Sequence, residues 1–262
     1  LGLREDALKA WKEEIESPHG IILVTGPTGC GKTTTLYSSL QEMNRKRLNI
    51  STVEDPVEYE LAGITQIQVH DKIDMTFSRA LRALLRQDPD VVLLGEIRDQ
   101  ETASVAIQAA MTGHLVLSTL HTNDAPSSLT RLINIGIEPF LVASAVNGVL
   151  AQRLARKVCP KCAQIKTPSK KEAKLLEGYN CEQIPHAVGC SACRGSGYSG
   201  RLGVYELLIM DDELRDAIAA NPTITSFRNL AIERGMQNLR HDGFAKVADG
   251  LTTVDEILRL TT

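Results

Sequence analysis

The chain has 262 residues, enough for one full domain and a smaller second one. Its formal net charge of −3 argues against nucleic acid as the main partner, because proteins that bind nucleic acid usually carry an excess of basic residues. No apolar run reaches the roughly 18 residues of a membrane-spanning helix and no secretory signal opens the chain, so we expect a cytoplasmic protein.

The chain begins with Leu1 rather than Met, and we therefore expect a piece of a longer protein. Apolar residues recur at helical spacing over residues 3–16, and Ser-Pro-His-Gly at residues 17–20 breaks this predicted helix. A short apolar run at residues 21–25 is the first predicted strand. It ends at a glycine-rich loop, which opens into a second predicted helix that runs to about residue 43.

The loop after the first strand matches the phosphate-binding pattern G-x-x-x-x-G-K-[ST]. Glycines in such a loop let successive backbone N–H groups surround a phosphate, and the N-terminus of the following helix adds positive potential. Lys32 is predicted to contact the β- and γ-phosphates, and the Thr33 hydroxyl is predicted to bind Mg²⁺. The predicted ATP-binding residues of the loop are Gly26, Pro27, Thr28, Gly29, Cys30, Gly31, Lys32, Thr33 and Thr34.

Predicted strands and helices alternate after the loop, which is typical of an α/β fold. This order implies a mostly parallel sheet that is covered on both faces and binds ligands at the carboxyl ends of its strands. We predict strands at residues 49–53, 63–69, 91–94 and 115–120, and helices at residues 77–86, 101–111 and 126–135, followed by a long helix at about 139–155.

Glu96 comes almost directly after the apolar strand predicted at residues 91–94. Nucleotide hydrolases with this type of loop place carboxylates there, which hold Mg²⁺ and activate water. Gly95 occupies the usual position of the first aspartate, so Glu96 either holds the metal indirectly or acts as the base. The alternative is a solvated glutamate at the end of a strand.

A second acidic group, Glu54, Asp55 and Glu58, follows the strand predicted at residues 49–53. Pro56 forces a turn there, and the turn is expected to face the nucleotide edge of the sheet. Three clustered acids favour a nearby cation, so we predict Mg²⁺ and an aligned water molecule beside them. A solvated loop is the alternative.

Two histidines, His114 and His121, flank the strand predicted at residues 115–120 and are therefore expected at its opposite ends. This separation argues against a shared metal. His121 lies beside two threonines at the carboxyl end of the strand. We interpret it as a sensor of the γ-phosphate, with a hydrogen-bonded structural histidine as the alternative.

Two C-x-x-C pairs, Cys159 with Cys162 and Cys190 with Cys193, are separated by 27 residues. This spacing is typical of a tetrahedral four-thiolate zinc site. Disulfides are disfavoured in the cytosol, and redox pairs seldom come as two matched pairs. We therefore predict a structural Zn²⁺ and place the other two cysteines outside the site.

The chain around the first cysteine pair is basic. Between Gln152 and Lys174 there are eight Lys or Arg residues and one acid, Glu172. These charges either offset the net −2 of a four-thiolate zinc site or form a docking face for an acidic partner or a membrane surface.

The remaining chain is predicted as a strand, starting at Arg201, followed by short helices. These helices are expected to be capped by Asp211-Asp212, Thr225-Ser226 and Thr253. We therefore predict three domains: an ATPase core at residues 1–156, a zinc module at 157–200 and a mostly helical subdomain at 201–262.

Together these motifs resemble those of the ATPases that drive type II secretion and type IV pilus assembly. The resemblance covers nearly the whole chain and is carried by GPTGCGKTTTLY (26–37), STVEDPVEY (51–59), LRALLRQDPDVVLLGEIRD (81–99), TGHLVLSTLHTNDA (112–125), AQRLAR (151–156), the cysteine pairs and GYSGRLGVYELL (197–208). It implies a RecA-like P-loop ATPase core that uses ATP, Mg²⁺ and Zn²⁺. It also implies a homo-hexameric ring that acts on an inner-membrane platform from the cytoplasm, with no nucleic-acid partner.

The resemblance also implies roles for individual residues. The attacking water is assigned in the family either to the acidic-box glutamate or to the Walker B glutamate, so both are joint candidates for the base. A further domain before this region is expected to contribute arginines to the site. The boxes map onto Lys32 and Thr33 (Walker A), Glu58 (acidic box), Glu96 (Walker B), and His114 and His121 (histidine box), with Arg153 as a candidate phosphate contact.

Two branches of similar ATPases, the pilus retraction and conjugative secretion ATPases, lack such cysteines, so the cysteine pairs argue against them. The segments at residues 73–90 and 139–154 look closer to the type II secretion branch than to pilus extension. The alternatives are a nucleic-acid or conjugative secretion motor with the same core fold, and a nucleotide-dependent scaffold with negligible hydrolysis.

Overall fold

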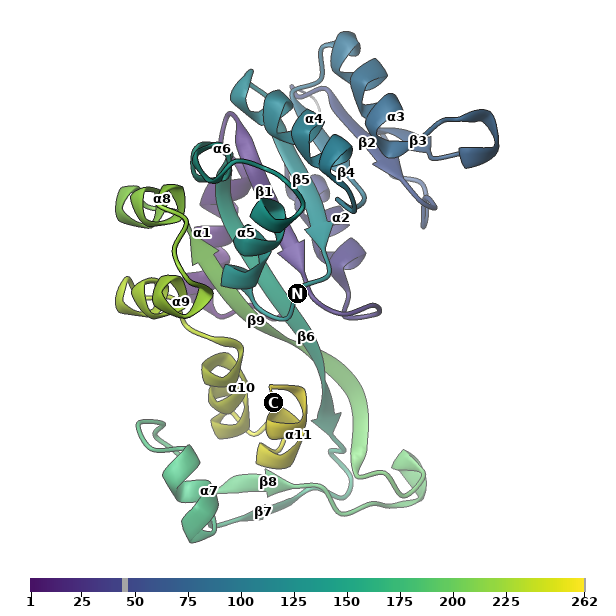
Figure 1. Ribbon diagram of the computed structural model, residues 1–262. Coiled ribbons are helices and arrows are strands. Elements are labelled where there is room, and N and C mark those ends of the chain that lie inside the picture. The colour runs from purple at the N-terminus through teal and green to yellow at the C-terminus, as the bar shows by residue number, and fades with distance from the viewer. Residues whose placement is uncertain (44–46, 262) are drawn as a thin grey trace. The chain divides into compact units, whose positions relative to one another are not determined.

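A computed structural model describes residues 1–43 and 47–261 of the chain (Figure 1). The chain forms two compact units. The sheet unit contains residues 4–151 and 207–236, and the cysteine unit contains residues 1–3, 152–206 and 237–262. The predicted division into three domains at residues 156 and 200 stays a prediction. No helix of the described chain is both long and apolar enough to cross a membrane.

The sheet is α/β in type, as predicted, and its strands follow the order β3-β2-β4-β5-β1-β6-β9. The pairs β1–β5, β1–β6, β2–β3, β2–β4 and β4–β5 are all parallel. Strands β1, β2, β4 and β5 are buried along their whole length, which explains their continuous apolar sequences. The strands are β1 (Gly20–Thr25), β2 (Ile50–Glu54), β3 (Thr65–Gln68), β4 (Val91–Leu94), β5 (Leu115–Leu120), β6 (Val146–Val158) and β9 (Tyr198–Ile209).

Helices cover both faces of the sheet. On one face α1 and α2 pack together, and the Trp11 indole N–H donates a hydrogen bond to the Ser39 hydroxyl at 3.0 Å. On the other face Ile21 and Leu23 of β1 share a core with α3, α4, α5, α6, α8 and α9. The helices of this unit are α1 (Glu5–Ile15), α2 (Lys32–Glu42), α3 (Phe77–Leu84), α4 (Gln100–Met111), α5 (Ala125–Asn134), α6 (Pro139–Ala145), α8 (Asp212–Ala219) and α9 (Ile224–Glu233), with short 3-10 turns at Asp71–Ile73 and Leu85–Gln87.

The prediction of a long helix at residues 139–155 is wrong. Helix α6 ends at Ala145, and the chain continues as β6 beside β1. Gly148 would weaken a helix, and a Cβ on it would lie 3.2 Å from the Leu208 carbonyl oxygen. The apolar run fits a buried strand as well as a buried helix, and its burial beside β1 decides between the two.

The C-terminal helices begin with side-chain caps, mostly as predicted. Asp211 caps α8 and Thr253 caps α11. The predicted cap at Thr225-Ser226 is wrong, because the Thr223 hydroxyl accepts the N–H of Ser226 and α9 begins two residues earlier. Asn238, which the sequence analysis did not single out, caps α10.

The cysteine unit contains the antiparallel pair of β7 and β8 and a core of its own. Ala155, Leu176, Ile184 and Val204 pack in this core with apolar residues of α10 and α11. The residues after 237 therefore share a core with the cysteine-bearing segment. Its elements are β7 (Gln164–Lys166), α7 (Lys170–Leu175), β8 (Ile184–His186), a 3-10 turn at Ser191–Cys193, α10 (Leu239–Ala248) and α11 (Val254–Leu260).

Candidate nucleotide and metal sites

The phosphate-binding loop joins the carboxyl end of β1 to the first residue of α2. Gly29 and Gly31 adopt φ angles of 76° and 92°, a region that glycine enters without steric cost. Gly31 is the residue before helix α2, so the chain turns directly from the loop into the helix. The loop and the helix N-terminus thus provide the backbone donors and positive potential that the motif predicts.

Lys32 folds back over its own loop. Its ammonium group donates hydrogen bonds to the carbonyl oxygens of Gly26 at 2.9 Å and Pro27 at 3.3 Å. The positive charge therefore lies against the loop that is predicted to hold the phosphates. Thr33 follows in the first turn of α2 and is half-buried, whereas Cys30 is buried.

A hydroxyl network ties the end of β1 to the chain after β5. The Thr25 hydroxyl donates to the Leu120 carbonyl oxygen at 3.1 Å and lies 2.8 Å from the Thr122 hydroxyl. Thr25 also accepts the backbone N–H of Thr122 at 2.9 Å. The sequence analysis missed Thr25. The signal that could have found it is a threonine that ends an apolar strand directly before the loop. These bonds fix the segment that carries His121 beside the phosphate loop.

Glu96 and His121, which the sequence analysis treated separately, come together because they follow the neighbouring strands β4 and β5. His121 Nε2 lies 3.4 Å from Glu96 Oε2, and the other carboxylate oxygen pairs with Arg98. The Glu96 side chain is 15% exposed, whereas those of His121 and Arg98 are about half exposed or more. Arg98 was not predicted, because a charged residue in a turn after a strand is usually solvated.

The turn that carries Glu96 is anchored to β5. The Thr119 hydroxyl donates to the Gly95 carbonyl oxygen at 2.7 Å, and the Ile97 N–H donates to the Thr119 carbonyl oxygen at 3.1 Å. A Cβ at Gly95 would lie 3.3 Å from Phe77 and from the carbonyl oxygen of Val53. A side chain at position 95 would therefore require Phe77 or the backbone of β2 to shift by a few tenths of an ångström.

The register of the sheet sets Glu96 and the phosphate loop on the same edge. Leu94 of β4 is level with Ser118 of β5, and Thr25 of β1 is level with Leu120 of β5. The loop after β1 and the turn after β4 therefore lie on either side of the end of β5. A hydroxyl from Thr33 and a carboxylate from Glu96 on one edge are oxygen donors of the kind that Mg²⁺ prefers.

Contrary to the prediction, Glu54 does not join Asp55 and Glu58 in an acidic cluster at the nucleotide edge. It is buried, and its carboxylate accepts hydrogen bonds from the hydroxyls of Tyr37 and Thr52 and from the Gln66 amide at 3.2 Å. Burial, and next the hydrogen bond to Glu54, raise the pKa of Tyr37 above its ordinary value. Glu54 therefore links the phosphate-loop helix to β2 and β3.

Glu58 is exposed, on the loop that follows β2. Tyr59 anchors the loop, because its ring packs edge-on against that of Tyr37 with the centroids 4.7 Å apart. The Gln66 amide donates to the Tyr59 carbonyl oxygen at 3.2 Å, and its oxygen accepts the Leu61 N–H at 2.6 Å. Before Glu58, the Val57 N–H donates to Gln68 Oε1 at 3.3 Å, so the loop is held on both sides of Glu58. The predicted catalytic role of Glu58 stays a prediction.

Two further predicted residues are His114 and Arg153. His114 stands at the other end of β5, where its Nδ1 is 3.0 Å from the Ala109 carbonyl oxygen. This position agrees with the expectation that the two histidines do not share a metal. Arg153 belongs to the cysteine unit, and its predicted contact with phosphate stays a prediction.

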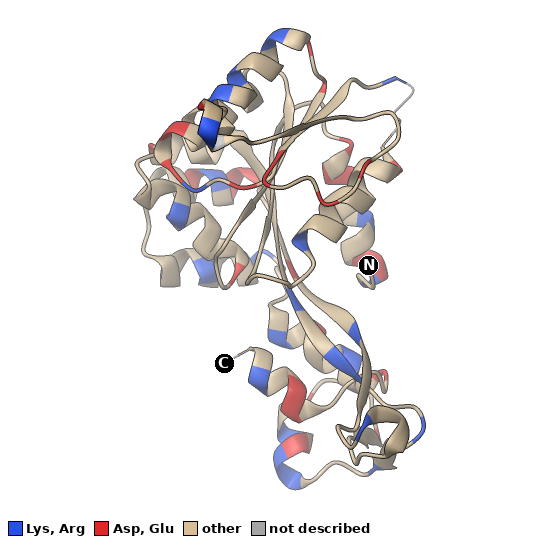
Figure 2. Cartoon of the chain, turned by 90° about the vertical axis from the view of Figure 1, so that its right-hand side faces the viewer, with Lys and Arg blue, Asp and Glu red and all other residues tan. Residues whose placement is uncertain are grey.

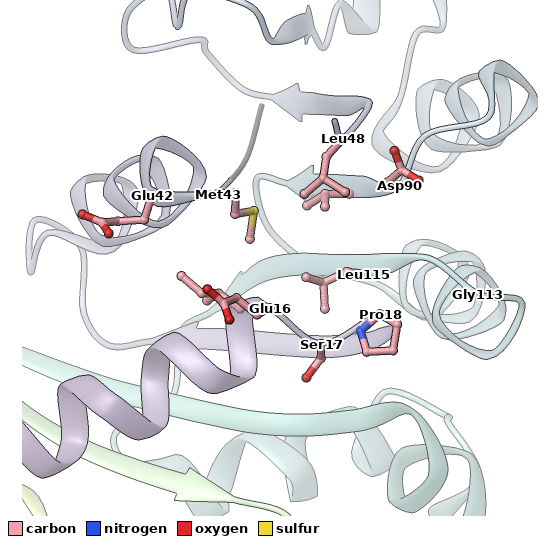
Figure 3. Close-up of a pocket in the computed structure, with 11 residues that line it drawn as sticks. Glu16, Ser17, Pro18, Glu42, Met43, Leu48, Asp90, Gly113 and Leu115 are labelled. Carbon is pink, nitrogen blue, oxygen red and sulfur yellow. The ribbon is translucent and has the colours of Figure 1, made fainter. Parts of the chain in front are cut away.

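A pocket of about 440 Å³ lies at the opposite edge of the sheet (Figure 3). Pro18 and Gly113 line it just before β1 and β5. Glu16, Glu42 and Asp90 contribute carboxylates, and Glu42 pairs with Lys12 at 3.2 Å. An acidic rim disfavours phosphate, so this pocket is no alternative to the loop after β1.

The four predicted zinc ligands converge in the cysteine unit. The Sγ atoms of Cys159 and Cys190 are 4.0 Å apart, those of Cys162 and Cys193 are 3.7 Å apart, and all four lie within 4.8 Å of one another. A tetrahedron with zinc–sulfur distances of about 2.3 Å has edges of about 3.8 Å. The spacing therefore fits one Zn²⁺ and is too long for disulfides.

Backbone donors favour thiolate at this cluster. The N–H groups of Cys190 and Gly197 donate to Cys193 Sγ at 3.1 and 3.2 Å. Burial raises the pKa of the Cys193 thiol, but these hydrogen bonds, with those from the Cys162 and Cys190 thiols, lower it to about 6, whereas burial raises the pKa of Cys162 to about 12. A thiolate is the form that binds metal, so the N–H donors at Cys193 add to the convergence of the four sulfur atoms in favouring a bound cation.

The strand order and the loop define a P-loop nucleotide-binding protein, in which β5 separates the phosphate-loop strand from the strand that precedes Glu96. The family model described as "Type II/IV secretion system protein" matches residues 1–259. The chain belongs to this family.

The chain is similar to proteins of both secretion and pilus machines. It is 52% identical to the type II secretion system protein HxcR of Pseudomonas aeruginosa over 261 residues, which cover 100% of this chain and 52% of that protein. It is 49% identical to the type IV pilus assembly ATPase TfpB of Acinetobacter baylyi, covering 99% of this chain and 45% of TfpB. The chain thus spans about half the length of the curated relatives it matches.

Solved structures agree with the fold. The pilus retraction motor PilT with bound ADP superposes with a TM-score of 0.76 at 30% identity, covering 99% of this chain and 65% of PilT. The ATPase DotB of Legionella pneumophila has a TM-score of 0.73 at 22% identity, covering 99% of this chain and 63% of DotB.

Proposed function

We propose that this chain is the ATP-hydrolysing part of a motor that powers type II protein secretion or type IV pilus assembly. The observation that carries the proposal is the convergence of the Lys32 loop and the Glu96–His121 pair on one edge of the sheet. Family membership and the similarity to ATPases of both machines support it. The segments that resemble the type II branch lead us to favour secretion.

In the proposed mechanism the loop N–H groups and Lys32 hold the phosphates of ATP and neutralise charge that develops on the γ-phosphate. Thr33 and Glu96 are the residues that would hold Mg²⁺, which supplies charge neutralisation when bound. Glu96 is our first candidate to orient the attacking water, because it is mostly shielded from solvent at the end of β4. Glu58 is the second candidate and is exposed.

His121 lies within ion-pair distance of Glu96 and is tied to the phosphate loop through Thr122. We propose that it reports the presence of the γ-phosphate to the Glu96 turn. In this scheme Zn²⁺ at the four cysteines is structural, because four protein thiolates leave no open position for substrate.

We further propose a homo-hexameric ring that acts at the cytoplasmic side of an inner-membrane platform. The support for this assembly is the family and the names of the relatives. Within each chain, we assign ATP hydrolysis to the sheet unit and structural support to the cysteine unit.

The test is phosphate release by the purified chain with Mg²⁺ and ATP, measured beside Lys32→Ala. Turnover by the unchanged chain that the variant lacks supports the proposal. Turnover that persists in a folded Lys32→Ala variant overturns it. Salt-dependent DNA binding with DNA-stimulated turnover would favour a nucleic-acid motor.

A further inference from the structure

The cysteine unit carries a groove that the proposed ATPase chemistry does not use. It measures about 510 Å³, and its apolar walls come from Val158, Pro160, Ala163, Ile165 and Leu251. Ile165 is 55% exposed, although it is a large apolar residue in a strand. Exposed apolar side chains that line a hollow are a common sign of a binding surface.

The groove lies against an open strand edge. Strand β7 pairs with β8 on one side, and no other strand of the described chain pairs with it. Ile165 is opposite Pro185, which has no N–H group, so this pair cannot be the hydrogen-bonded kind. The backbone N–H and C=O of Ile165 therefore point away from β8, where an added strand would bond to them.

The surroundings of the groove are positively charged. Residues 152–206 contain ten Lys or Arg and four Asp or Glu residues, in a chain whose net charge is −3. Lys157 lines the groove, and Lys161 and Lys166 stand on the segments that supply its walls. All three are exposed, and none of them belongs to an ion pair among the described residues. One acid, Asp249, lies next in sequence to the lining residue Gly250. Figure 2 shows the Lys and Arg residues in blue.

We propose that this groove binds an extended acidic segment of a partner protein, which adds a strand to β7 and places an apolar side chain among Val158, Ile165 and Leu251. Backbone pairing with β7 supplies the geometry of such recognition, and the pocket and the lysines select the sequence. An apolar anchor flanked by Asp or Glu is the complement of this surface.

A membrane surface fits these observations less well. Segments that bind membranes present protruding apolar side chains, usually on one face of a helix that is rich in Trp, Phe or Leu. Here the apolar side chains line a concave wall, and that wall includes Pro160 and Ala163, which are next in sequence to Cys159 and Cys162. The inference does not depend on ATP hydrolysis, so it can fail without affecting the proposed function.

The test uses the full chain and a phage-displayed library of random peptides as the probe. We expect enrichment of peptides with an apolar residue between acids. In fluorescence anisotropy titrations of a synthesised consensus peptide, Ile165→Asp and the double variant Lys157→Glu, Lys166→Glu should each weaken binding by about tenfold or more. Lys171→Glu is the matched control, because Lys171 lies on α7 and does not line the groove. Circular dichroism and zinc content show that each variant is folded.

A second measurement leaves the protein unchanged. A consensus peptide that is N-methylated at its anchor residue lacks the donor for strand pairing, and we expect it to bind about tenfold more weakly or worse. Equal binding by this peptide, or by the groove variants, overturns the proposal. A selection that yields no acidic consensus also overturns it. In that case, loss of sedimentation with phosphatidylglycerol vesicles by the same variants would indicate a membrane surface, and loss of self-association in light scattering would indicate a second copy of this chain.

Discussion

His121 Nε2 lies 3.4 Å from Glu96 Oε2, and the two residues follow neighbouring strands of the sheet. This contact joins two residues that the sequence analysis assigned to separate boxes. We therefore propose that they act as a pair, so that a change in one should alter the effect of a change in the other on ATP hydrolysis.

The first prediction concerns Glu96. We expect Glu96→Gln to lower kcat for ATP hydrolysis by about 10²- to 10⁴-fold, because it removes the proposed base. The effect on nucleotide affinity should be smaller, since Lys32, Thr33 and the loop N–H groups remain and glutamine keeps an oxygen donor near Mg²⁺. Steady-state phosphate release and nucleotide titration measure the two effects. Glu58→Gln is the competing variant and Glu101→Gln, on the surface of α4, is the control. A larger loss of kcat in Glu58→Gln would reverse our ranking of the two glutamates.

The second prediction concerns Lys32. We expect Lys32→Ala to weaken ATP binding by about tenfold to a hundredfold, because it removes a charge-assisted contact to phosphate. The fold should persist, since the Lys32 ammonium donates hydrogen bonds to the Gly26 and Pro27 carbonyl oxygens of its own loop and not to the apolar core. Titration with a fluorescent ATP analogue gives the affinity, and Lys9→Ala on α1 is the control. Unchanged affinity in a folded variant would contradict the assignment of the loop.

The third prediction is one tightly bound Zn²⁺ per chain. Metal analysis should show loss of zinc in Ser variants of Cys159, Cys162, Cys190 or Cys193. Ser variants of Cys30 and Cys181 should retain zinc. Removal of zinc should unfold the cysteine unit first, because metal binding contributes folding energy to a segment with a small core. Retention of zinc in Cys190→Ser, or an unchanged melting curve after chelation, is the contrary result.

The fourth prediction concerns the pH dependence of stability. Glu256 is buried between Arg156 and Arg259, and although burial raises its pKa, hydrogen bonds from these arginines lower it to about 2. Because the folded-state pKa lies below the unfolded value, the stabilisation is complete above about pH 4.5 and is lost as the pH falls toward 2. We expect Glu256→Gln to cost about 2 to 3 kcal/mol at neutral pH and to flatten the acid side of the profile.

Urea unfolding of the cysteine unit from pH 7 down to pH 3 measures this dependence. Glu177→Gln is the control, since Glu177 is exposed. An equal loss of stability at both ends of the pH range would show that the carboxylate charge is not the cause.

The fifth prediction concerns the buried contact between Tyr37 and Glu54. We expect Tyr37→Phe to destabilise the sheet unit by about 1 to 3 kcal/mol, because Glu54 loses a donor inside the core. Adding Glu54→Gln should restore part of that loss, which a double-mutant cycle measures. Strictly additive losses would mean that the two side chains do not stabilise each other.

Much of the sheet unit could be predicted, because its strands are continuous apolar runs and its loop has a specific pattern. The four cysteines were equally readable from spacing alone. The change from helix to strand at Val146 could not be predicted, since a buried apolar run has no periodicity that distinguishes a helix from a strand. The position of Glu54 also depends on partners distant in sequence, Tyr37 and Gln66, which no local pattern joins.

The anchors on β5 have a consequence for tolerance to sequence change. Thr25 and Thr122 tie the phosphate loop to the end of this strand, and Thr119 ties the Glu96 turn to it. The distance between loop and carboxylate is therefore set by two intervals between adjacent strands, about 9 to 10 Å. The spacing of the strands thus fixes the separation between the phosphate loop and the Glu96 turn. Loops outside this edge can then vary in length without changing the gap across which ATP would react.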